Sequence, residues 1–121
     1  MNTLSVKSNQ PLVKGNPDHR YGIAEKSYGL ILAALSQEPA IEQAILFGSR
    51  ALGRPRNGSD IDLAIVGENC TYKTLSALSR LLNDDLPIPY YLDLVHYNSL
   101  EHADLMEHIN RYGVTIYRRT T

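Results

Sequence analysis

Asp60 and Asp62 stand two positions apart, in a segment where acidic and apolar residues alternate. Side chains two positions apart in a β-strand point to the same face, so an extended segment 60–66 would bring both carboxylates together. Adjacent carboxylates repel each other and favour a bound cation. Mg²⁺ is the hard ion that proteins commonly hold between carboxylates and substrate phosphates. The same alternation is also typical of the solvated face of an ordinary strand, and the pair alone does not decide between these readings.

A third acid, Asp93, lies in the middle of the apolar segment 90–96. If that segment is a strand beside 60–66, Asp93 joins the other two carboxylates. Three carboxylates suit a two-metal phosphoryl-transfer site, in which the metals stabilise the attacking and leaving oxygens. A carboxylate near the attacking hydroxyl can also take its proton. The alternative is an acid paired with a basic side chain and without a catalytic role.

Gly48 and Ser49 follow the apolar segment 41–47 directly. Glycine allows a ligand to approach the backbone closely, and Ser49 adds a hydroxyl donor. If residues 49–52 open a short helix, its free N–H groups would face a phosphate. No Gly-Lys-Ser/Thr sequence follows, so the segment is not a Walker A loop. Most Gly-Ser pairs are plain turns, and the pair has meaning only together with the acids.

Three arginines, Arg50, Arg54 and Arg56, follow within seven residues and have no acid among them. Guanidinium groups bind phosphate oxygens well, so these side chains could meet a triphosphate or a partner surface. A solvated basic loop is the competing interpretation. His96, His102 and His108 have no metal-ligand spacing and are read as surface or packing residues.

Seven elements are expected to position these residues. Helical spacing of apolar residues predicts helices that begin near residue 18 or 24 and end at 36, and that span 71–84 and 100–112. Strands are predicted over 41–47, 60–66 and 90–96, with a short terminal strand over 114–117. This order favours an α/β (α+β) fold, with a small mixed sheet and helices packed mainly on one face. Residues 1–17 are expected to form a loosely ordered tail before one domain, 18–121.

The composition narrows the class of protein. The chain has 121 residues, a net charge of −1 and a single cysteine, Cys70. The charge argues against a nucleic-acid-coating protein, and no direct nucleic-acid binding is expected. One cysteine excludes an internal disulfide and fits a reducing compartment. No apolar stretch approaches the ~20 residues that span a bilayer, and residues 1–17 do not resemble a signal peptide. We therefore expect a cytoplasmic protein with no membrane contact.

Gly48-Ser49, then ten residues, then Asp60-Ile61-Asp62 resembles the signature of the DNA polymerase β-like nucleotidyltransferase superfamily. Segments 44–51 and 58–65 look like the stand-alone minimal nucleotidyltransferase (MNT) branch. Asp93 stands where that branch carries its third acid, and segment 107–117 resembles its C-terminus. The resemblance covers about residues 20–118. It implies a polymerase β-like nucleotidyltransferase fold.

The resemblance also implies a function. MNT proteins are commonly encoded beside a helical HEPN protein, as the antitoxin of a toxin–antitoxin pair. Members of this kind transfer AMP from ATP to a tyrosine of the toxin and silence its RNase activity. By position, Asp60 and Asp62 would bind two Mg²⁺ ions, and Asp93 would bind one and help to deprotonate the acceptor hydroxyl. Gly48 and Ser49 would hold the triphosphate tail.

The length of the chain agrees with a protein acceptor. A unit of about 100 residues can hold one nucleotide and its metals, but it leaves little chain for a second wall around an acceptor. A cognate HEPN toxin, bound as a hetero-oligomer, would supply that wall. Tyrosines 90, 91, 112 and 117 are candidates for its interface, or else for packing. Two other functions stay open: an antitoxin that only binds its toxin, and a transferase of a small-molecule hydroxyl.

Overall fold

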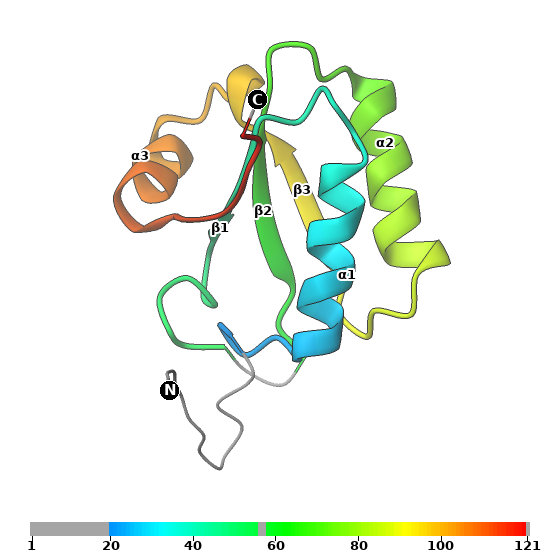
Figure 1. The fold of residues 1–121 in the computed structure, drawn as a ribbon. Coiled ribbons are helices and arrows are strands. Elements are labelled where there is room, and N and C mark those ends of the chain that lie inside the picture. The colour runs from blue at the N-terminus through cyan, green and yellow to red at the C-terminus, as the bar shows by residue number, and fades with distance from the viewer. Residues whose placement is uncertain (1–19, 56–57, 121) are drawn as a thin grey trace.

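The computed structural model describes residues 20–55 and 58–120, which form one four-stranded sheet with helices on both faces (Figure 1). The predicted tail, 1–17, lies outside these residues. The elements are α1 (Glu25–Ser36), β1 (Gln43–Phe47), β2 (Ile61–Val66), α2 (Tyr72–Arg80), the π-helical η1 (Leu81–Asp85), β3 (Leu92–His96), the 3₁₀-helical η2 (Tyr97–Ser99), α3 (Ala103–Tyr112) and β4 (Val114–Arg118).

The strand order is β3-β2-β1-β4. Strand β1 pairs antiparallel with both β2 and β4, whereas β2 pairs parallel with β3. A parallel pair needs a crossover between its strands, and α2 supplies it here. The sheet is therefore mixed, and the predicted fold class is confirmed.

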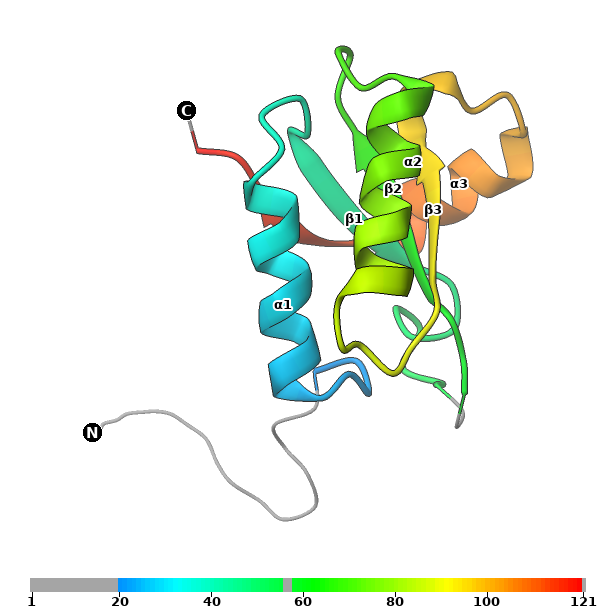
Figure 2. The same ribbon diagram turned by 90° about the vertical axis from the view of Figure 1, so that its right-hand side faces the viewer.

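Successive side chains of β2 point to opposite faces of the sheet and so contribute to two separate apolar clusters. Ile61, Leu63 and Ile65 are fully buried in the larger core, under α1 and α2. Ala64 points to the opposite face, in a smaller cluster with Ile109 of α3. Figure 2 shows α1 and α2 on one side of the sheet and α3 on the other. Among the described residues, Asp60 just before β2 and Asp93 of β3 are exposed.

Helix α1 starts near the later of the two predicted positions. Ala24 is its N-cap and offers no side chain to cap the helix, but its N–H donates to Tyr90 Oη at 3.0 Å. At 12 residues α1 is the longest helix. Within the part of the chain that the structure describes, no helix is long and apolar enough to cross a membrane.

Two predicted elements differ from the structure. The helix expected over 49–52 is a single turn, closed by hydrogen bonds from Leu52 N to Gly48 O and from Arg54 N to Ser49 O. Gly53, with φ of +75°, ends it. The helix expected over 71–84 is α-helical only to Arg80 and continues as η1, because the chain there forms wider i to i+5 turns.

Candidate active site

The parallel pairing of β2 and β3 places Asp62 directly beside Asp93 in register. Both carboxylates point to the face that α3 covers, because Ala64 and Val95, two positions further along, pack in the cluster under α3. Asp60 lies one residue before β2, not within it as predicted. Asp60 and Asp93 are exposed and Asp62 is half-buried. The structure thus brings Asp62 and Asp93 side by side, with Asp60 near enough for its charge to act on Asp62.

Asp62 is the electrostatic centre of this group. Burial raises the pKa of the Asp62 carboxyl, and the charges of Asp93 and Asp60 raise it further, while those of Arg50 and His108 lower it. Across residues 20–55 and 58–120, no salt bridge reaches any of the three acids. Neighbouring negative charge without a paired cation is the condition that favours a bound metal ion.

The donor set fits Mg²⁺ when the ion arrives with a nucleotide. In the described residues, no three His, Cys, Asp or Glu side chains form a ready-made metal cluster. Mg²⁺ in phosphoryl-transfer sites usually takes one or two carboxylates and completes its shell with substrate phosphates and water. Asp60, Asp62 and Asp93 would supply the oxygens that this arrangement needs from the protein.

Gly48 brings the end of β1 against this acidic group. Phe47 pairs with Asp62 across the β1–β2 ladder, and Gly48 follows with φ of +80°. A Cβ built on Gly48 would overlap Oδ2 of Asp62. Only glycine permits both the backbone conformation and this close approach. Gly48 therefore lies against Asp62, and Ser49 follows it in the turn after β1.

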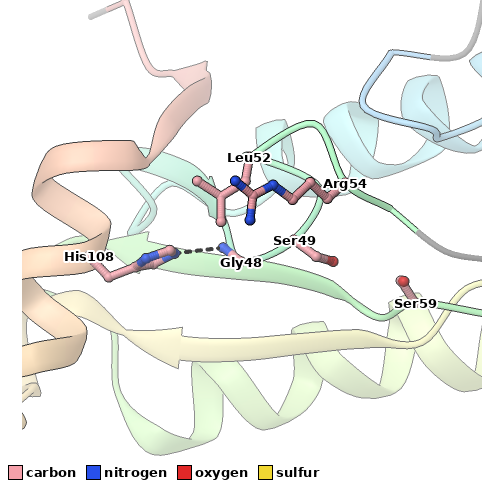
Figure 3. Close-up of a pocket in the computed structure, with 6 residues that line it drawn as sticks. All are labelled: Gly48, Ser49, Leu52, Arg54, Ser59 and His108. Atoms are coloured by element: carbon pink, nitrogen blue, oxygen red, sulfur yellow. Dashed lines mark hydrogen bonds between the residues drawn. The ribbon is translucent and has the colours of Figure 1, made fainter.

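His108 of α3 is a site residue that the sequence analysis missed. The N–H of Gly48 donates to His108 Nε2 at 3.0 Å (Figure 3). The imidazole also packs edge-on against Phe47. No spacing in the sequence marks this histidine, since only the packing of α3 on the sheet brings it to the end of β1. Its position would have required knowing which face α3 covers.

Next to the acids lies a pocket of about 400 Å³. Figure 3 shows the side chains around it, which come from the turn after β1, the segment before β2, and α3. Its lining residues are Gly48, Ser49, Leu52, Arg54, Ser59 and His108. Hydroxyl, guanidinium and imidazole groups around one hollow suit an anionic ligand of phosphate type.

The three arginines of this segment have different surroundings. Arg54 is exposed and lines the pocket. Arg50 is only 2% exposed and donates hydrogen bonds to four backbone carbonyls. The interpretation of Arg50 as a solvated loop residue is therefore wrong. Arg56 lies outside the described residues.

The family comparison agrees with the polymerase β-like fold that the sequence predicted. Residues 30–121 match the family model described as "Polymerase beta, Nucleotidyltransferase". The chain belongs to that family. No curated protein matches it.

Solved structures of toxin–antitoxin complexes share the fold. A chain from a toxin–antitoxin crystal structure with AMP-PNP is 23% identical, with a TM-score of 0.60 over 79% of this chain and 74% of that chain. A chain from the complex of the tri-AMPylated Shewanella oneidensis HEPN toxin with MNT antitoxin is 21% identical, with a TM-score of 0.59 over 78% and 72%. A chain from the MntA-HepT toxin–antitoxin is also 21% identical, with a TM-score of 0.59 over 78% and 73%. At these identities the likeness establishes the fold.

Proposed function

We propose that this chain is a Mg²⁺-dependent nucleotidyltransferase that transfers AMP from ATP to a tyrosine of a HEPN-family toxin and thereby acts as its antitoxin. The observation that carries the proposal is the in-register pairing of Asp62 with Asp93 next to Gly48. Gly48, which approaches Asp62, also lines the pocket of about 400 Å³. The protein would act in the cytoplasm, where nucleotide and toxin are both present.

Each residue has a definite part in the transfer. The Asp93 carboxylate takes the proton of the acceptor tyrosine hydroxyl, whose oxygen then bonds to the α-phosphorus of ATP. The bond from that phosphorus to the bridging oxygen breaks, and pyrophosphate leaves. Bound Mg²⁺ would neutralise the charge that builds on the phosphate oxygens. Asp60 and Asp62 would hold the ions, with Asp93 binding one of them, while Gly48 and Ser49 would hold the triphosphate tail.

Two kinds of observation support a protein acceptor. Chains with this fold come from a HEPN toxin–MNT antitoxin complex and from a toxin–antitoxin structure with AMP-PNP. In this chain, Asp60 and Asp93 are exposed, so a side chain on another molecule can reach them. Tyr91 and Tyr112 are 57% and 45% exposed, which leaves apolar area for a partner.

The test is the intact mass of the HEPN protein encoded next to this chain, after incubation with the chain, ATP and Mg²⁺. We expect a gain in whole AMP units, and loss of that gain in the double variant Asp60→Asn/Asp62→Asn. Asp84→Asn/Asp85→Asn is the matched control, because it removes the same charge from two exposed acids of η1. This control should transfer AMP as the wild type does.

Other results would favour the two other functions. A stable complex without any mass gain, together with full neutralisation by the Asp60→Asn/Asp62→Asn variant, would mean an antitoxin that acts by binding alone. Absence of both modification and complex would point to a small-molecule hydroxyl as acceptor. Labelled ATP with a panel of alcohols and sugars would then find it.

A further inference from the structure

The side chain of Arg50 joins the segments that carry the candidate catalytic residues. It leaves the turn directly after Ser49 and is 2% exposed. Its Nη2 donates to Ser59 O at 2.7 Å, and its Nε donates to Asp60 O at 3.2 Å. Both hydrogen bonds hold the backbone at Asp60, one of the candidate metal ligands. One side chain therefore connects the Gly-Ser turn to the acidic segment.

The other half of the guanidinium binds the turn before α1. Nη1 donates to Tyr21 O at 3.1 Å and to Gly22 O at 3.0 Å. Tyr21 has φ of +56° and Gly22 has φ of +75°, and Ile23 N bonds to Arg20 O across the turn. A tyrosine in the left-handed region is strained, and such strain persists only where surrounding contacts enforce it. This turn is shaped so that two consecutive carbonyls meet Arg50.

A third contact of Arg50 is with Tyr90, in the segment that leads to Asp93. The Arg50 guanidinium lies 5.0 Å from the centre of the Tyr90 ring, in a cation–π arrangement. Tyr90 is three residues before Asp93, and its hydroxyl accepts the N–H of Ala24 at the start of α1. Arg50 thus contacts the approach to β3 as well as the approach to β2.

We propose that Arg50 is a positioning residue of the metal site and not a phosphate ligand. Four of its hydrogen bonds are made to backbone carbonyls, so the Asp60 carboxylate is held beside Asp62 through the main chain. A lysine cannot replace it, because only the planar guanidinium offers five donors in a fixed fork. This inference rests on the proposed function, since it assumes that the acids bind Mg²⁺ with a nucleotide.

The experiment compares Arg50→Lys with a matched variant, Arg119→Lys. Arg119 makes the same kind of contact away from the acids: Nε donates to Ile41 O and Nη2 to Glu38 O, at 3.0 and 2.8 Å. Binding of Mn²⁺, as a probe for Mg²⁺, is measured by electron paramagnetic resonance in the presence of a non-hydrolysable ATP analogue. We expect Arg50→Lys to bind Mn²⁺ at least ~10-fold more weakly than wild type, the usual effect of an outer-shell change. Arg119→Lys should stay within about twofold, although both variants melt at lower temperature.

A second variant keeps the test decisive if Arg50→Lys does not fold. Gly22→Ala keeps the arginine in the sequence, but its Cβ would stand 2.9 Å from both Arg50 Nη1 and Pro55 Cγ, so the guanidinium has to shift. Mn²⁺ binding should fall in this variant too. Equal Mn²⁺ binding by wild type and both site variants, or an equal loss in Arg119→Lys, would overturn the inference.

The same measurements separate the inference from the proposed function. If wild type binds Mn²⁺ but adds no AMP to the toxin, and Arg50→Lys still binds Mn²⁺ weakly, the proposed transfer fails and the positioning role stands. If wild type adds AMP and Arg50→Lys binds Mn²⁺ normally, only the positioning role fails. If wild type binds no Mn²⁺ with the nucleotide analogue, both are wrong.

Discussion

At the scale of single residues, the Asp62 carboxylate occupies the space where a Cβ on Gly48 would stand. Gly48→Ala would place a Cβ against Asp62 Oδ2 and would also strain a residue with φ of +80°. The carboxylate must turn away, so we expect AMP transfer to fall by at least ~10-fold, with a loss of about 1–2 kcal/mol in the free energy of unfolding from the left-handed backbone. Mass spectrometry of the toxin and urea denaturation measure the two effects.

Gly53→Ala is the control for this prediction. Gly53 has φ of +75°, but nothing lies within 4 Å of a Cβ built there. It should lose similar stability and keep its transfer activity. If both alanine variants lose activity equally, backbone strain is the cause and the contact with Asp62 is not.

Asp62 also gives a prediction about pH. Burial, together with Asp93 and Asp60, raises the pKa of the Asp62 carboxyl above its usual value. The folded state therefore holds this proton more tightly than the unfolded state, so stability from this group is present at low pH and is lost as pH rises through the raised pKa. Asp62→Asn removes that loss. We expect its melting temperature to exceed that of wild type near pH 7, with a difference that shrinks as pH falls toward 4. A difference that grows on acidification would contradict this.

The chemistry-bearing residues differ in how visible they are in the sequence. The acids, Gly48 and Ser49 are recognisable because a strand or a turn fixes their geometry over a few positions. Arg50 and His108 are not, because their partners lie 9 to 60 residues away. Arg50 looks like any basic loop residue until the turn at Tyr21 folds over it. Long-range packing, which local spacing does not encode, gives both residues their place.

At the scale of elements, β3 is an edge strand whose start is fixed by a side chain. Asn83 of η1 accepts the N–H of Leu92 at 2.8 Å and donates to the Leu92 carbonyl at 3.0 Å. The Asn83 amide thus makes the two hydrogen bonds that a neighbouring strand would make with Leu92, the residue before Asp93. Asn83→Ala leaves the N–H and carbonyl of the fully buried Leu92 without the Asn83 amide, so we expect the free energy of unfolding in urea to fall by about 1–3 kcal/mol. AMP transfer should fall as well, since Asp93 follows Leu92.

Asn98→Ala is the comparison at the other end of β3. Asn98 Oδ1 accepts the N–H of Gly67 at 2.9 Å, far along the sheet from the acids. This variant should lose stability without losing transfer at saturating ATP. Loss of transfer in both variants would mean that general destabilisation, and not the place of Asp93, limits the activity.

The elements themselves were largely predictable, for a physical reason. Apolar residues at helical or alternating spacing must bury one face, so the three long helices and four strands occur close to where the pattern predicts them. The short helix considered for 49–52 is only a single turn, because Gly53 ends it there. Periodicity also does not tell which face of the sheet a helix covers, so the place of α3 opposite α1 and α2 could not be predicted.

At the scale of the whole molecule, the described residues leave part of the acidic group accessible to another molecule. Asp60 and Asp93 are exposed, and the neighbouring pocket of about 400 Å³ is lined by groups that suit phosphate. In the proposed transfer, the toxin would position the acceptor, and positioning is a large part of the rate in group transfer. We therefore expect the chain alone to release pyrophosphate from ATP at background rate.

Adding the HEPN partner should raise pyrophosphate release at least ~10²-fold, because a docked hydroxyl replaces an encounter in solution. A coupled pyrophosphate assay measures this rate. A partner in which phenylalanine replaces the modified tyrosine should bind equally well but give no increase, since it lacks the attacking oxygen. If pyrophosphate appears at the same rate with either partner, water is the acceptor, and the complex completes the site without supplying the substrate.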